Sequence, residues 1–146
     1  MNTLTTRVLL AALFVLPCAV TVADDRSYTE GTVTEVTYIR TKPGMFDEYM
    51  KWVATQRKQE MEELKKAGVI VSYSVYAASP RTPQEPDLIL TITYKNMAAL
   101  DGLNDKTDPI DKKVFGSVEN ATQGAISRGQ MREVLGSELV RELVLK

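Results

Sequence analysis

The chain has 146 residues, and its 18 basic and 19 acidic side chains give a formal net charge of −1. Both signs are interspersed along the sequence, so the basic surface that nucleic-acid binding requires is not expected. The sequence contains no histidine and a single cysteine, Cys18. These absences argue against zinc thiolates, histidine-ligated haem and Ser-His-Asp catalysis, and we expect neither a metal nor a cofactor.

Residues 1–23 have the pattern of an export signal. Arg7 precedes an apolar run over residues 8–22, and Ala23 stands before the acidic pair Asp24-Asp25. The run is short for a membrane span. Cleavage after Ala23 is therefore expected to leave a protein of the bacterial periplasm or exterior with no stable membrane span. An uncleaved N-terminal anchor is the alternative interpretation.

Residues 24–31 are polar and predict a flexible lead-in to a single domain over residues 32–146. The domain begins with a predicted strand at residues 32–40, which are rich in β-branched and aromatic side chains. Both faces of this strand are partly polar. Pro43-Gly44 then predicts a tight turn, because proline cannot donate to a sheet and glycine accepts turn dihedrals.

A long amphipathic helix is predicted after the turn, and Gly68 marks its end because glycine readily adopts the left-handed conformation that closes helices. Its apolar side chains recur at three- and four-residue steps and form one stripe: Phe46, Tyr49, Met50, Val53, Met61 and Leu64. One face of the helix is expected to pack and the other to face solvent.

Two further strands are predicted at residues 69–77 and 87–94. In the first, alternation predicts an apolar face and a more polar face, which are Val69, Val71, Tyr73 and Val75 against Ile70, Ser72, Ser74 and Tyr76. The connection at residues 79–86 holds three prolines, which cannot donate to a sheet. The two strands therefore read as a hairpin with a long loop.

Helical segments are predicted next. Asn96 is a suitable cap for a short helix at residues 97–100. Beyond it, apolar residues recur at helical spacing from Ile110 to Ala125 and indicate a second segment.

The end of the chain predicts strand again. We expect a strand at residues 131–135, a bend at Gly136-Ser137 and a further strand at residues 138–146. The complete order predicts an α+β protein with a ferredoxin-like βαββαβ fold. Its sheet is antiparallel, its helices lie on one face, and an extra C-terminal strand follows.

The turn Lys42-Pro43-Gly44, the helix carrying Phe46 and Tyr49, and the strand end Tyr94-Lys95-Asn96 resemble dimeric α/β barrel proteins. That group includes the antibiotic-biosynthesis monooxygenase-like domains, and the chain looks like an exported member. The resemblance implies two ferredoxin-like sheets paired in a homodimer. It also implies a small-molecule pocket between each sheet and its helices or inside the barrel. Some members bind haem through a histidine, which this chain lacks.

A homodimer is also expected from the pattern itself, because helices on one face of a four-stranded sheet leave the other face without a partner. We expect the segment from Leu139 to Lys146 to cross to the partner subunit or to pair with it.

Six residues are candidates for ligand contact: Tyr38, Arg40, Trp52, Tyr76, Thr93 and Arg132. In this hypothesis Trp52 and Tyr76 stack on an aromatic ligand, with the indole nitrogen of Trp52 available to it. Tyr38 and Arg40 hold the polar end of the ligand. Thr93 belongs to the hydroxyl-rich face of the hairpin, and Arg132 reaches the same pocket as Arg40.

Each candidate also has a structural interpretation. Trp52 would simply pack on the flank of the helix, and Tyr38 and Arg40 would form a salt-bridged sheet edge with Glu35 or Glu48. Arg132 and its neighbour Glu133 would make cross-strand ion pairs.

The function that these patterns favour is binding of a small aromatic or phenolic molecule. The alternative is a cofactor-independent monooxygenase-like enzyme, and the second alternative is a non-enzymatic dimeric interaction module. Without histidine, a catalytic base would be a carboxylate whose pKa is raised by burial, or a tyrosine or lysine whose pKa is lowered by a neighbouring cation. No residue is singled out as catalytic.

Overall fold

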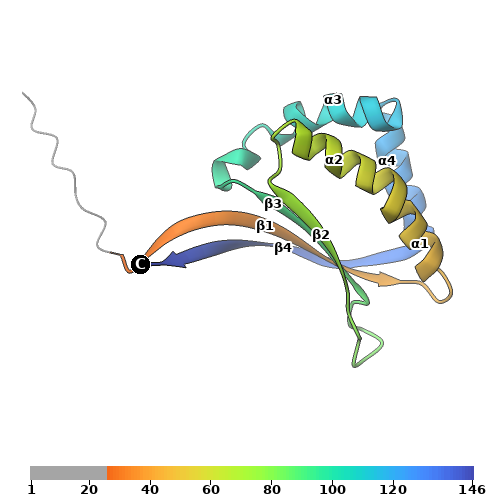
Figure 1. Cartoon of the computed structure of the whole chain (residues 1–146). Helices are drawn as coiled ribbons and strands as arrows, with labels where there is room; N and C mark the ends of the chain where they lie inside the picture. The colour runs from red at the N-terminus through yellow and green to blue at the C-terminus, as the bar shows by residue number, and fades with distance from the viewer. Residues whose placement is uncertain (1–25) are drawn as a thin grey trace, which may run out of the picture.

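A computed structural model of the chain describes residues 26–146 (Figure 1). The predicted export signal at residues 1–23 lies outside the described residues. No helix in the described part of the chain is long and apolar enough to cross a membrane.

Four strands form one antiparallel sheet in the order β2-β3-β1-β4, with the helices on one side (Figure 1). The elements follow in the order β1 (Tyr28–Thr41), α1 (Phe46–Trp52), the π-helical η1 (Val53–Arg57), α2 (Lys58–Lys66), β2 (Ser72–Ala77), β3 (Leu88–Tyr94), the 3-10 helix η2 (Met97–Leu100), α3 (Leu103–Phe115), α4 (Val118–Ser127), the 3-10 turn η3 (Arg128–Gln130) and β4 (Arg132–Leu145). The predicted α+β, ferredoxin-like arrangement is confirmed.

The long helix is present, but its middle is wound differently from its ends. α1, η1 and α2 follow one another without a break, and η1 is a π-helical segment of five residues. Gly68, beyond the end of α2, has a φ of +71°, as its role in closing the helix predicts. π-Helical turns inside α-helices are often found at functional sites, because they rotate the side chains that follow.

The ends of the sheet differ from the prediction. β1 begins at Tyr28, which pairs with Leu145, so residues 28–31 belong to the sheet and not to a flexible lead-in. β4 is a single strand, so the prediction of a separate C-terminal strand is wrong. The expected bend is a β-bulge: Tyr38 pairs with Gly136 and Ile39 with Val134, which leaves Leu135 unpaired. An extra residue in one strand bends it without ending it.

The core lies between the helices and the sheet. Tyr49 and Val53 of the helical stripe are buried against Ile39 and Leu88 from the sheet, and Met61 is buried in a second cluster with Tyr94. Burial of such side chains is the main favourable term in folding.

Two details of the predicted packing are wrong. Phe46 is 39% exposed, and at the start of the second strand Ile70 is buried whereas Val71 is exposed. The reversal has a simple cause, because β2 begins only at Ser72 and the residues before it do not follow the alternation of a strand.

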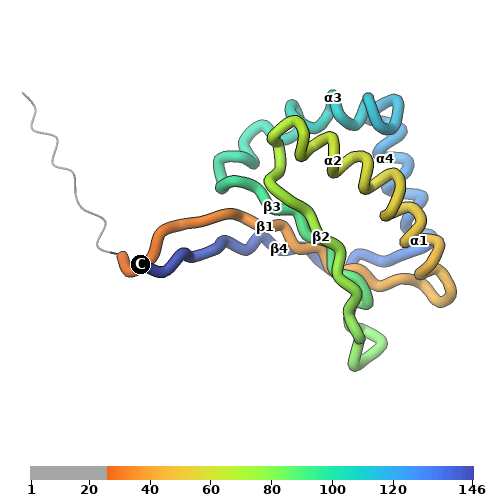
Figure 2. Tube along the Cα trace, in the orientation of Figure 1, coloured from red at the N-terminus to blue at the C-terminus, as the bar shows by residue number. Residues whose placement is uncertain are grey.

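β1 and β4 continue beyond the helices as a two-stranded ribbon (Figure 2). Apolar side chains on both faces of β4 are exposed: Leu143, Val144 and Leu145 in this ribbon, and Leu139 and Val140 just before it. Gly31 allows the close pairing of the ribbon, because an added Cβ there would lie 2.8 Å from Oε2 of Glu142. The ribbon therefore presents unpartnered apolar surface.

Candidate functional site

The structure separates the six predicted ligand residues into two groups. Tyr38, Arg40, Tyr76 and Thr93 lie on the face of the sheet that carries no helices, because they alternate with the buried strand residues. Trp52 is partly buried and packs against the core on the other face, and Arg132 pairs with Thr41 on that same side.

The predicted shared pocket is therefore not formed within one subunit. Trp52 and Tyr76 lie on opposite sides of the sheet, so they do not stack on one ligand, and Arg132 does not share a pocket with Arg40. The indole nitrogen of Trp52 is also not available, because it donates to Oε1 of Gln56 at 2.7 Å.

On the open face the polar side chains are paired with each other. The Tyr38 hydroxyl donates to Oε1 of Glu138 at 2.5 Å, and this hydrogen bond is the main cause that raises the pKa of Tyr38. The Thr34 and Thr93 hydroxyls lie 3.0 Å apart. Tyr76 is 54% exposed. The structural interpretation of Tyr38, pairing with a carboxylate, is therefore present. Its partner is Glu138, however, and not Glu35 or Glu48.

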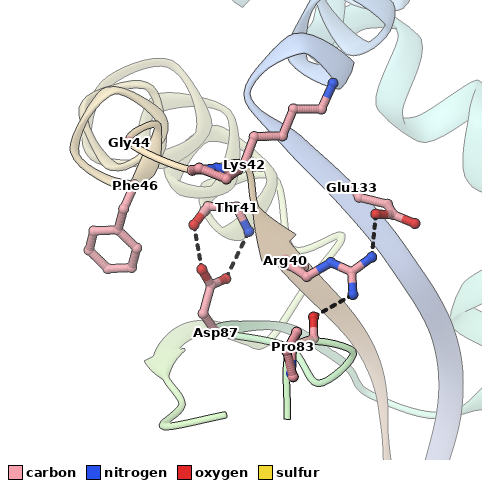
Figure 3. A pocket seen from close by; sticks show the side chains of 9 residues that line it. Arg40, Thr41, Lys42, Gly44, Phe46, Pro83, Asp87 and Glu133 are labelled. Atoms are coloured by element: carbon pink, nitrogen blue, oxygen red, sulfur yellow. Dashed lines mark hydrogen bonds and ion pairs between the residues drawn. The ribbon is translucent and has the colours of Figure 1, made fainter.

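A hollow of about 510 Å³ lies at the end of β1, where it meets the turn before α1 (Figure 3). Arg40 donates to Oε2 of Glu133 and to the carbonyl oxygen of Pro83, both at 2.6 Å. The Thr41 backbone N–H donates to Oδ1 of Asp87 at 3.0 Å, and the Thr41 hydroxyl donates to the other carboxylate oxygen. The Arg40 and Asp87 groups of this hollow thus already have partners within the chain.

Between α1 and β4, two aromatic rings lie against two arginines. Tyr49 and Trp52 stack there with ring centroids 5.7 Å apart and an interplanar angle of 21°. The guanidinium carbon of Arg128 lies 4.0 Å from the Trp52 centroid, and that of Arg132 lies 5.5 Å from the Tyr49 centroid. We call these four residues the arginine–ring cluster. Such cation–π contacts hold guanidinium groups against aromatic faces.

Three buried polar atoms in this cluster have no hydrogen-bond partner. They are the Tyr49 hydroxyl, Nε of Arg128 and Nε of Arg132, and no other buried side-chain nitrogen or oxygen in residues 26–146 lacks a partner. Most buried polar atoms in proteins are hydrogen-bonded, so their gathering at one place needs an explanation. A bound molecule would supply the missing partners.

The charges around the cluster are mostly positive. Burial lowers the pKa of Arg128, and the neighbouring charge of Arg132 lowers it further. Burial raises the pKa of Tyr49 although three arginines, Arg132, Arg57 and Arg128, oppose this effect. The Tyr49 hydroxyl therefore remains a hydrogen-bond donor at neutral pH.

A second hollow, of about 250 Å³, lies between α2, α3 and α4 beside this cluster. Its wall contains Glu60, Asp111, Phe115, Val118, Ala121, Thr122, Ala125 and Arg128. Arg128 therefore borders both the hollow and the stacked rings. Burial raises the pKa of Glu60, against the nearby charges of Arg57 and Arg128.

Several of these residues were missed in the sequence. Tyr49 was assigned to the core, and Arg57 and Glu60 were not considered, although they continue the helical steps from Val53. A charged residue within an apolar stripe was the signal that could have identified both. Arg128 carried no such signal, because its position depends on how the end of α4 packs against α1.

No group of three or more His, Cys, Asp or Glu side chains in residues 26–146 is arranged to hold a metal ion.

The comparisons with known proteins identify a fold. The crystal structure of HapK from Hahella chejuensis matches with a TM-score of 0.52 and 17% identity, over 75% of this chain and 91% of that chain. A dimeric ferredoxin-like protein from an uncultured marine organism matches with a TM-score of 0.48 and 14% identity, over 81% of this chain and 98% of that chain. No protein-family model and no curated protein sequence matches the chain.

At these identities the likeness concerns the fold alone. The chain has a ferredoxin-like α+β fold with a four-stranded antiparallel sheet.

Proposed function

We propose that this protein is an exported small-molecule-binding protein that works as a homodimer, and that its ligand is an aromatic or phenolic compound held by the arginine–ring cluster. One observation carries the proposal: the three buried polar atoms without partners all belong to this cluster. An unsatisfied buried donor costs about 1–3 kcal/mol, so a ligand that pairs with these atoms would recover this free energy.

The surroundings of the cluster support a ring-shaped ligand. The hollow beside Arg128 has an apolar wall that includes Phe115, Val118 and Ala121. Its volume of about 250 Å³ is just below the usual range for ligand sites, about 300–1,000 Å³, so it suits a small compound with one ring. Apolar walls with a few polar groups are typical of small-molecule sites.

The position of Trp52 provides a direct assay, because it is the only tryptophan in the chain. Phenolic and quinone-like compounds would be screened by thermal shift, and each hit titrated by Trp52 fluorescence. We expect saturable quenching, and a ligand at a hundred times its Kd should stabilise the fold by about 2.7 kcal/mol. Binding measured by calorimetry should weaken in Trp52→Ala and persist in Tyr76→Ala.

The opposite effects of these variants would place the ligand site elsewhere. If Tyr38→Phe, Arg40→Ala or Tyr76→Ala abolishes binding while Trp52→Ala does not, the ligand occupies the open sheet face. If no compound stabilises the protein, the non-enzymatic interaction module becomes the better assignment.

One observation favours the enzymatic alternative as a second candidate. Glu60 borders the hollow, and burial raises its pKa, which is the property expected of a carboxylate base in a chain without histidine. Glu60 would accept the proton of a phenol, which then reacts with molecular oxygen. One oxygen atom would become a quinone oxygen, the other would leave as water, and the phenol would supply the electrons.

Oxygen consumption tests this candidate. Saturable uptake with a phenolic hit that is lost in Glu60→Gln but kept in Glu62→Gln, an exposed residue of the same helix, would establish turnover. Binding without oxygen uptake would assign the protein to binding alone.

The homodimer is proposed from the surface that the subunit leaves uncovered. The ribbon of β1 and β4 exposes apolar side chains on both faces, and the open face of the sheet has no helices. A second copy would cover both.

Sedimentation analysis at micromolar concentration should give a dimer that dissociates in Leu143→Asp but not in Val71→Asp, which changes an exposed residue away from the ribbon. A wild-type monomer would contradict this part of the proposal.

Export is proposed from residues 1–23 alone. N-terminal sequencing of protein from fractionated cells should find a chain that starts at Asp24 in the soluble fraction. A chain that starts at Met1 in the membrane pellet would indicate an anchor.

A further inference from the structure

Six of the arginines in the described part of the chain fall into two groups. Three are paired with carboxylates at the surface: Arg40 with Glu133 at 2.6 Å, Arg81 with Glu85 at 2.9 Å, and Arg141 with Glu30 at 2.7 Å. Three others, Arg57, Arg128 and Arg132, make no ion pair with any residue in the described part of the chain. These three lie around Tyr49, which feels the charge of each.

This distribution is the reverse of what stability alone would favour. An exposed ion pair contributes little, whereas a half-buried guanidinium without a counter-ion is costly. Arg128 and Arg132 also repel each other, since the charge of one lowers the pKa of the other. Glu60 partly offsets this repulsion, because its charge raises the pKa of Arg128, but burial raises the pKa of Glu60 itself.

The cluster presents arginine in a form suited to an anion. The face of the Arg128 guanidinium is covered by the Trp52 ring, at 4.0 Å from its centroid. A guanidinium that stacks through its face keeps its N–H donors in its own plane, where a planar carboxylate can accept two hydrogen bonds. Gly124 gives the group room, because an added Cβ there would lie 3.2 Å from Nη1 of Arg128.

We infer that the arginine–ring cluster is a receptor for an organic anion, an aromatic compound that carries a carboxylate. Arg128 and Arg132 bind the carboxylate, the Tyr49 hydroxyl donates to it, and the ring lies in the hollow between α2, α3 and α4. This inference rests on the proposed function and adds the chemical class of its ligand.

The test compares matched ligands on the full chain. Benzoate, 4-hydroxybenzoate and phenylacetate would be titrated by calorimetry and Trp52 fluorescence beside their amides, which have the same shape without the charge. We expect at least one carboxylate to bind roughly tenfold or more tightly than its amide, because charge-assisted pairs with arginine are the stronger ones. Its affinity should also fall with salt more steeply than that of the amide.

Arginine variants test whether the preference for a carboxylate over its amide comes from Arg128 and Arg132. Arg128→Gln and Arg132→Gln should each weaken carboxylate binding roughly tenfold and leave the affinity for the amide nearly unchanged. Arg128→Lys keeps the charge and should recover only part of the affinity, since lysine lacks the planar donor fork. Arg81→Gln is the matched control, because Arg81 is exposed, pairs with Glu85 and is not part of the arginine–ring cluster. Thermal denaturation of each free variant checks that it is folded.

The outcomes separate this inference from the proposed function. If amides bind as tightly as carboxylates, or if the arginine variants weaken both equally, the anion receptor is wrong while small-molecule binding stands. If carboxylates bind but Arg128→Gln and Arg132→Gln have no effect, the anion lies elsewhere and the inference also fails. If neither carboxylates, amides nor the phenolic screen give binding, both proposals fail.

Discussion

The open face of the sheet and the arginine–ring cluster on the helix side differ in whether their polar groups have hydrogen-bond partners. On the open face and in the hollow near Asp87, Tyr38, Arg40 and Thr93 have partners from the same chain. On the helix side, Tyr49, Arg128 and Arg132 each bury a polar atom that has none. Paired groups are explained by the stability of the sheet, whereas the unpaired buried groups lack such an explanation and are the observation on which the proposed ligand site rests. If volume alone decided the ligand site, the hollow at the end of β1 would be chosen over the smaller one beside Arg128.

The largest expected difference is in the free energy of unfolding, between a tyrosine on the helix side and a tyrosine on the open face of the sheet. Tyr49 is fully buried and Tyr76 is 54% exposed. Tyr49→Ala should destabilise the fold by about 3–5 kcal/mol, because it removes an aromatic ring from the core. Tyr76→Ala should change stability by no more than about 0.5 kcal/mol in the free subunit. Urea denaturation of both variants gives the comparison, and equal effects would contradict the assigned core.

Removing single hydroxyls sharpens the comparison. Tyr49→Phe deletes a buried donor without a partner and should leave the free protein unchanged or more stable by about 1 kcal/mol, while it weakens ligand binding. Tyr38→Phe breaks a hydrogen bond to Glu138 and should leave ligand binding unchanged. Denaturation and calorimetry on the same samples measure both quantities. A loss of stability in Tyr49→Phe would show that its hydroxyl is already satisfied.

Substitutions at two glycines test, with a smaller expected effect, whether ligand binding depends on the position of the Arg128 side chain. Gly124→Ala should raise helix stability by up to about 1 kcal/mol, because glycine is a poor helix former, yet it pushes on Arg128 and should weaken ligand binding several-fold. Gly136→Ala on β4 meets no atom within 4 Å and should leave binding unchanged. Unchanged binding in Gly124→Ala would mean that Arg128 does not need this position.

The smallest effect expected is a difference in pH dependence between Glu60 and Glu85. Burial raises the pKa of Glu60, so its contribution to stability is present below its ordinary value of 4.5 and is lost as pH rises through the raised pKa. Hydrogen bonds from Arg81 lower the pKa of Glu85, so its contribution is present above 4.5 and is lost as pH falls through the lowered pKa.

Melting temperatures of wild type, Glu60→Gln and Glu85→Gln between pH 3 and 8 measure this difference. Relative to wild type, Glu60→Gln should gain stability as pH rises, and Glu85→Gln should lose it. The same sign for both would contradict the assigned surroundings of Glu60.

Much of the fold could be predicted because it depends on local patterns. The alternation in β3, the apolar stripe from Tyr49 to Leu64 and the glycine at Gly68 each specify a local conformation. The extent of β4 could not be predicted in this way. A bulge at Leu135 and a bend at Gly136 look alike in sequence, and only pairing with β1 distinguishes them.

The sequence by itself determined the class of fold, the absence of histidine chemistry and which residue types are able to act. It also indicated Trp52 and Arg132, but grouped them with Tyr38, Arg40 and Tyr76. Only the tertiary structure decided which side chains meet, because neighbouring residues on a strand face opposite sides and the end of α4 is positioned by long-range packing. Arg128 reaches Trp52 across 76 positions of the sequence, and no local pattern encodes that contact.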